Sequence, residues 1–214
     1  MNEFIQKYHF EDYFVNDLLN EDTEIIFILE SPHVYEVKNG YPVAGKSGKD
    51  MSKVLFCDEA LKKESFGKLI FEKKVQKFGI INISNIPLQE LAYDLSDDNF
   101  SSLHPKSTSS HSLTAHVELI FKDFALFRQN PTLRKKDCRV NTLIKMYQED
   151  FISRLSPYKD KKIVLCGAFV HKIFNDTFLH SDFKEVLEVP HPSFNNWSKA
   201  KYSEKIEKLL EFVK

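Results

Sequence analysis

The segment from Ile25 to Gly48 constrains the fold of this chain more than any other part of it. It opens with the apolar run IIFIL, which is β-branched and aromatic and too short for a helix, so it predicts a strand buried on both faces. Glu30 follows the run directly, and Ser31, Pro32 and His33 come next. Open α/β sheets bind ligands at the carboxyl ends of such strands. We therefore expect this strand end to belong to the functional site.

A glycine-rich loop follows, with Gly40, Pro42, Gly45 and Gly48 within nine residues. Its backbone can approach a partner closely, and its N–H groups can face an anion. The apolar positions between residues 49 and 63 predict a helix behind the loop. The amino end of such a helix suits a phosphate or an anionic leaving group.

Three further apolar runs predict strands, the first two of them buried, and helical patterns separate them. The runs cover residues 78–87, 162–168 and 186–190, and the helical patterns cover residues 2–20, 113–130, 140–155, 169–178 and 202–213. Alternating strands and helices favour a parallel sheet with helices on both faces. At 214 residues, the chain is long enough for one well-buried domain and short for two. We therefore predict one three-layer α/β/α domain over residues 1–214, with a polar loop at 94–112.

Composition narrows the class of protein. The formal net charge of −1 argues against a strongly basic nucleic-acid protein, although a local basic face is compatible with it. The three cysteines form no CxxC pair, which argues against a structural zinc site and a disulfide scaffold and predicts a reduced, cytoplasmic location. No apolar run reaches the length of a membrane span. We expect no metal, no cofactor and no membrane partner.

Three of these segments resemble motifs of the uracil-DNA glycosylase superfamily. There a buried strand ends in Gly-Glu-Ala-Pro-Gly, and a later Gly-x-Pro-Phe-x-Gly-x-Ala-Gly segment leads into a helix. Here LESPH stands at the first motif and GYPVAGKSG at the second. The superfamily ends its last strand in His-Pro-Ser or His-Pro-Ala, and residues 191–193 read His-Pro-Ser. The resemblance covers about residues 23–214 and implies a four-stranded parallel sheet of the uracil-DNA glycosylase kind.

The resemblance implies a hydrolase of DNA base-excision repair that cleaves the N-glycosidic bond of uracil or another aberrant base after flipping it out of the stack. The implied catalytic residues are Glu30, Ser31 and His191. Glu30 would orient or deprotonate the attacking water, and His191 would stabilise the oxyanion that develops on the base. Asn82 would read the base, since an amide presents a donor and an acceptor side by side. A loop-capping role is the alternative for Asn82 and Asn85.

The remaining implied contacts include departures from the family pattern. Val43 stands where these members stack a Phe on the base, and His33 or Tyr41 could substitute, so base binding is predicted for all three with Asn82. Phe194 or Trp197 could hold the base stack open as a wedge. Contacts to the DNA backbone are predicted for Gly45, Lys46, Ser47, Gly48, Ser193 and Phe194. This branch usually carries an iron–sulfur cluster on four cysteines, and three unpaired cysteines exclude it here.

The expected partner is DNA, damaged or single-stranded, bound by a monomer. Because of the departures, a different base or a lost activity fits the sequence equally well. Two other hypotheses stay open at this point. One is a nucleotide- or nucleic-acid-binding relative without glycosylase activity. The other is an unrelated α/β hydrolytic enzyme that uses Glu30 and His191 as an acid–base pair.

Overall fold

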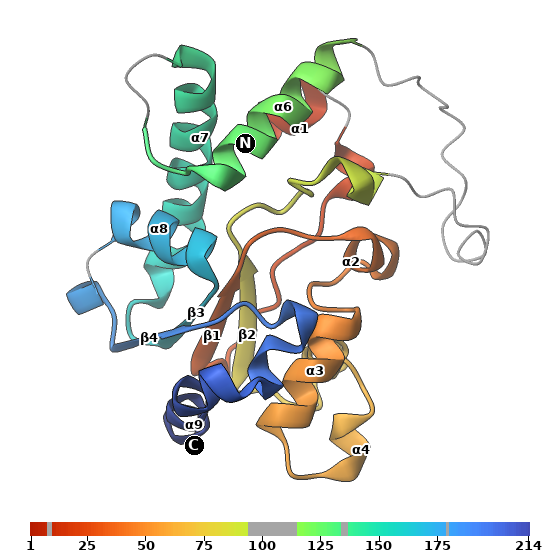
Figure 1. Cartoon of the computed structure of the whole chain (residues 1–214), viewed down its shortest axis with the longest axis vertical. Coiled ribbons are helices and arrows are strands. Elements are labelled where there is room, and N and C mark those ends of the chain that lie inside the picture. Colours follow the sequence, from red (N-terminus) through yellow and green to blue (C-terminus); the bar gives the residue numbers. More distant parts are fainter. Residues whose placement is uncertain (8–9, 94–114, 134–136, 179) are drawn as a thin grey trace.

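The computed structural model describes residues 1–7, 10–93, 115–133, 137–178 and 180–214 (Figure 1). Its centre is a four-stranded, all-parallel sheet of order β2-β1-β3-β4. The strands are β1 (Ile25–Leu29), β2 (Phe78–Asn82), β3 (Lys162–Cys166) and β4 (Glu185–Val189). Helices cover both faces of the sheet, which confirms the predicted α/β/α fold with its parallel sheet.

The strands separate two hydrophobic layers because successive side chains of a strand point to opposite faces. Ile26 and Ile28 join the layer under the helices α6 (Ala115–Gln129), α7 (Cys138–Leu155) and α8 (Ala168–Thr177). Phe27 and Leu29 join the layer under α3 (Lys46–Leu55), α5 (Phe66–Phe71) and α9 (Ser203–Phe212). Every residue of β1 is buried, as expected for a strand covered on both sides.

Helices are present close to four of the predicted ranges, 113–130, 140–155, 169–178 and 202–213. The described helices are α1 (Asn2–Lys7), α2 (Val34–Asn39), α3 (Lys46–Leu55), α4 (Glu59–Lys62), α5 (Phe66–Phe71), α6 (Ala115–Gln129), α7 (Cys138–Leu155), α8 (Ala168–Thr177) and α9 (Ser203–Phe212). None of these combines the length and apolarity that a membrane span requires. The loop predicted at 94–112 lies outside the described residues.

Two helix predictions were wrong in extent. The amino-terminal helix ends at Lys7 instead of continuing to residue 20, and Leu18 forms an antiparallel bridge with Ile80 at the edge of β2. The backbone groups of that edge need partners, and they outweigh the helical pattern of the apolar residues. The helix predicted at 49–63 is broken into α3 and α4, where the Asp58 carboxylate accepts N–H groups of the first turn of α4.

Sheet register decides where the candidate site lies. Leu29 pairs with Asn82 and Cys166 pairs with Val189, so the four strands end at one edge. From β1 the chain continues to β2 on one side, and from β3 it continues to β4 on the other side. The strand order therefore reverses between β1 and β3, and a crevice for ligands is expected outside the carboxyl ends of these two strands.

Candidate active site

His191 follows β4 and is held in one tautomer by its neighbour. The backbone N–H of Ser193 donates to Nδ1 of His191 at 3.2 Å, and the Ser193 Oγ lies 2.7 Å from the same nitrogen. Because a backbone N–H can only donate, Nδ1 is the acceptor and the ring proton of a neutral imidazole sits on Nε2. Burial lowers the pKa of His191, with Arg128 adding to the effect and Glu30 opposing it. His191 therefore presents a neutral N–H donor at the carboxyl edge.

Gly167, which follows β3, packs against the side chain of His191. Its backbone has φ of +99° and ψ of 159°, a region almost restricted to glycine. A Cβ at this position would lie 2.9 Å from the Cβ of His191, too close for two carbon atoms. The glycine therefore lets the imidazole sit directly against the end of β3.

The residues after His191 hold its backbone in place through two hydrogen bonds. Asn196 Nδ2 donates to the His191 carbonyl at 3.0 Å, and Trp197 Nε1 donates to the Pro190 carbonyl at 2.7 Å. Trp197 is 3% exposed and packs against Phe27 in the core. Trp197 therefore cannot reach DNA as a wedge.

Phe194 has the opposite environment. Its side chain is 87% exposed, and its backbone φ is +57°, which is uncommon for an aromatic residue. It lies in the segment Ser193–Ser198, which packs beside α3. Of the two predicted wedge residues, Phe194 is the one that the structure leaves available.

Glu30 follows β1 and is paired with an arginine that sequence reasoning missed. The Nε of Arg128, in the last turn of α6, donates to Oε1 of the Glu30 carboxylate. The side chain of Glu30 is 18% exposed and that of Arg128 is 35% exposed. Arg128 is remote in sequence and is surrounded by an ordinary apolar helix pattern, so no local signal marks it. Ser31 Oγ accepts a long hydrogen bond from the Leu88 N–H at 3.4 Å.

Asn82 ends β2 with an unusual side chain. It is 2% exposed, and its Oδ1 is a buried acceptor with no hydrogen-bond partner in the described part of the chain. Its backbone is held by Asp17, whose carboxylate accepts the Asn82 N–H, and by Arg154, which donates to the Asn82 carbonyl. The neighbouring Asn85 uses its Nδ2 on the Val15 carbonyl at 2.7 Å. Asn85 therefore has a structural role, while the Oδ1 of Asn82 is left without a donor.

The glycine-rich loop packs against its own chain. Val43 is 3% exposed, has φ of +53° and joins the core, and its N–H donates to the Glu36 carboxylate. A Cβ on Gly48 would lie 1.9 Å from the Val43 carbonyl oxygen. The close approach that glycine permits at position 48 is thus to the protein's own backbone, where a ligand was the expectation.

Glu36 links the start of α2 to this loop. Its other oxygen accepts the His33 N–H at 2.6 Å. Burial raises the pKa of Glu36 to about 7, against the opposing effect of the Val43 and His33 N–H groups. Sequence reasoning missed Glu36 as well, although its place three residues into a short helix after His33 is that of a capping acid.

The other predicted contacts spread around this edge. Tyr41 stacks on Phe71 of α5, with ring centroids 5.0 Å apart, and His33 is exposed at the start of α2. Gly45 precedes α3, Lys46 is exposed in its first turn, and Ser47 is partly exposed beside it. Glu30 and Arg128 form an ion pair, and both influence the pKa of His191, so these three side chains lie near one another. Tyr41 instead packs against α5.

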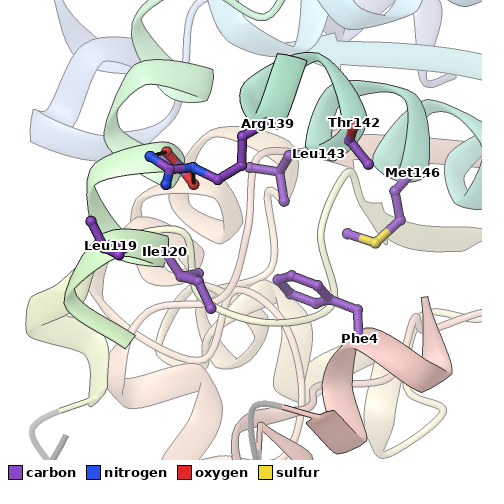
Figure 2. A pocket seen from close by; sticks show the side chains of 8 residues that line it. Phe4, Leu119, Ile120, Arg139, Thr142, Leu143 and Met146 are labelled. Atoms are coloured by element: carbon purple, nitrogen blue, oxygen red, sulfur yellow. Dashed lines mark hydrogen bonds and ion pairs between the residues drawn. The ribbon is translucent and has the colours of Figure 1, made fainter. Parts of the chain in front are cut away.

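A cavity of about 360 Å³ lies apart from these residues, among α1, α6 and α7 (Figure 2). Phe4, Ile120, Leu143 and Met146 give it an apolar lining, and Arg139 lies at its wall. Within the described ranges, no group of three or more His, Cys, Asp or Glu side chains could hold a metal ion.

Comparison with known proteins identifies the relationship. The family model described as the uracil DNA glycosylase superfamily matches residues 17–214, almost the whole chain. A comparison with curated proteins gave no match.

Proposed function

Because this chain belongs to the uracil DNA glycosylase superfamily, we propose that it is a DNA-base N-glycosylase acting on uracil or another aberrant base. The observation that carries the proposal is the pairing of two groups at the carboxyl edge. His191 is a neutral donor with its proton on Nε2, and Glu30 is a carboxylate close enough to influence the His191 pKa. The family match removes the hypothesis of an unrelated α/β hydrolytic enzyme.

The chemistry needs a donor for the leaving base. As the N-glycosidic bond breaks, negative charge develops on the base and positive charge on the sugar. The Nε2–H of His191 would donate to a carbonyl oxygen of the departing base, where a neutral donor stabilises the new anion. The low pKa of His191 serves this role, because the imidazole stays neutral at physiological pH.

Glu30 would act on the sugar side of the same bond. Its carboxylate would favour positive charge at C1′ and accept a proton from the attacking water. One of its oxygens accepts from Arg128, which leaves Oε2 to orient that water. Ser31 adjoins Glu30 in the chain and belongs to the proposed catalytic set by this position alone.

Base reading and base flipping would use the residues around these two. The unsatisfied Oδ1 of Asn82 is buried, and a base that reached it would donate an N–H from its pairing edge and supply the partner that it lacks. Phe194 can enter the space that the flipped nucleotide vacates, as exposed apolar wedges do in other DNA-bending proteins. Lys46, Ser47 and Ser193 can contact phosphates. We further propose that the protein acts as a monomer in the cytoplasm.

The test is a strand-nicking assay after alkaline cleavage of abasic sites, on oligonucleotides with uracil, hypoxanthine or a mismatch. We expect release of at least one base, and we expect His191→Ala to lose about 10²–10³-fold in single-turnover rate, as is typical for one anion-stabilising donor. His180→Ala is the matched control, because His180 is half-exposed and pairs with Asn175 away from the edge. Lack of release of any base by the wild-type protein would refute the proposal.

One observation favours a second candidate, a DNA-binding relative without catalysis. Glu30, the proposed water-activating group, is already paired with Arg128. Salt-dependent binding of oligonucleotides with no base release would support this candidate.

A further inference from the structure

We propose that Arg128 binds a DNA phosphate beside the target nucleotide while it holds Glu30, and so couples DNA binding to the orientation of the water-activating carboxylate. This inference rests on the proposed function, and it adds a phosphate-binding and positioning residue outside the motif segments. Arg128 belongs to α6, far in sequence from β1 and from the segment after β4.

The hydrogen bonds of Arg128 are incomplete. Its Nε donates to Glu30, and neither of its Nη groups bonds an acceptor in the part of the chain that the structure describes. A guanidinium carries five N–H donors in a rigid fork, so four remain for a ligand. The side chain is 35% exposed, which leaves these donors within reach of a partner from solvent.

Two other arginines show that this arrangement is distinctive. Arg139 grips both oxygens of Asp123, through Nε at 2.7 Å and Nη2 at 3.0 Å. Arg154 uses Nε, Nη1 and Nη2 on protein acceptors, at 2.8 to 2.9 Å. Both of these side chains commit at least one Nη group to the protein. Among the described residues, Arg128 donates to the protein through Nε alone. This is expected for a side chain that binds a carboxylate with one donor and a ligand with the others.

The ligand that fits the remaining donors is a phosphodiester. The terminal N–H groups of a guanidinium match two phosphate oxygens in bidentate geometry. A flipped nucleotide brings one phosphate on its 5′ side and one on its 3′ side to the edge where Glu30 and His191 lie. The chain as a whole carries a net charge of −1, so its affinity for DNA has to come from individual cations at this edge.

The bridge has a consequence for catalysis. A phosphate bound to the Nη groups would fix the guanidinium, and the guanidinium would fix the Glu30 carboxylate with Oε2 toward the water. Arg128→Gln should therefore weaken DNA binding and slow the chemical step together. Arg128→Lys should keep the attraction to phosphate but lose the rate, because a single ammonium cannot hold both partners in a defined geometry.

The experiment measures binding and single-turnover rate on the same oligonucleotide. Binding is titrated at several salt concentrations with an oligonucleotide that carries an uncleavable analogue of the released base. For Arg128→Gln we expect the slope of log K against log[salt] to fall by about one and the rate to fall at least tenfold. For Arg128→Lys we expect the slope of the wild type with a similar loss of rate.

Arg139→Gln is the matched control, since Arg139 also donates through Nε to a carboxylate but lies at the cavity of Figure 2. The side chain of Arg139 is 63% exposed and that of Asp123 is 6% exposed, so this variant should lose stability through the unpaired Asp123 carboxylate. At a temperature where the variant is folded, its salt slope and its rate should stay at the wild-type level. Thermal unfolding of each variant confirms that the assay is run on folded protein.

The outcomes separate this inference from the proposed function. A wild-type salt slope for Arg128→Gln overturns the phosphate contact, whatever the rate. A reduced slope in a protein that releases no base supports the contact and overturns only the glycosylase activity. A wild-type protein that does not bind DNA overturns both.

Discussion

Gly167→Ala should damage the candidate site by displacing His191, although Gly167 itself carries no chemical group of the site. The new methyl group would lie 2.9 Å from the His191 Cβ, whereas carbon atoms in contact prefer about 3.5–4.0 Å. His191 must therefore move by roughly 0.6–1 Å, or the end of β3 must move. A misplacement of about 1 Å can cost about 10²-fold in rate, so we expect a loss of that order in single-turnover base release.

The same substitution should destabilise the fold. An alanine at φ +99° costs about 1–3 kcal/mol in backbone strain, and overpacking against His191 adds about 1–3 kcal/mol. We expect the free energy of unfolding, measured by urea titration, to fall by about 2–6 kcal/mol. Activity must be compared at a temperature where both proteins are folded.

Gly45→Ala is the matched control for this experiment. Gly45 has φ of −90°, and a Cβ there would meet the Tyr35 side chain at 3.4 Å, an ordinary contact. Gly45 is the N-cap of α3, where alanine is less favourable than glycine, so we expect a loss of stability of at most about 1 kcal/mol. If Gly167→Ala kept wild-type stability and a rate within twofold, the packing of Gly167 against His191 would not position the imidazole.

Three further predictions concern other parts of the edge. Phe194→Ala should leave the free energy of unfolding within about 0.5 kcal/mol of the wild type, because the ring is 87% exposed. It should slow base release from duplex DNA at least tenfold and slow release from single-stranded DNA less. Equal losses on the two substrates would contradict a wedge. Because the pKa of Glu36 is raised to about 7 from its ordinary 4.5, the native state holds this proton more tightly than the unfolded chain. Wild-type stability should therefore fall as pH rises from about 4.5 to about 7, by up to about 3 kcal/mol, and Glu36→Gln should remove that decline in urea titrations across this range. Arg154→Met should lower the free energy of unfolding by about 3–5 kcal/mol, because it leaves the Asp17 carboxylate and two backbone carbonyls without their donor. Thermal or urea unfolding measures this loss. A loss below about 1 kcal/mol would show that water replaces the guanidinium as the donor.

The chain's own pattern was sufficient for the sheet and for the position of the site along the chain. β1 and β2 are short, almost wholly apolar runs, and burial on both faces leaves such a run few alternatives. β4 contains Glu185 and Glu188 and is partly exposed, so its strand was predicted from a weaker pattern. Parallel strands end at the same edge, so the polar residues after β1 and β4 were expected to be neighbours. In the structure the charge of Glu30 opposes the lowering of the His191 pKa, so the two side chains lie near one another.

Tertiary packing decided which side chains are exposed or paired at the carboxyl edge of the sheet. Phe194 and Trp197 are both large aromatic residues three positions apart, yet one is 87% exposed and the other is 3% exposed, because only Trp197 reaches the Pro190 carbonyl and the core. Arg128 pairs with Glu30 because the last turn of α6 lies beside the end of β1 in the folded chain. A local pattern records which residues avoid water, but the partner of a polar group depends on which elements the folded chain brings beside it.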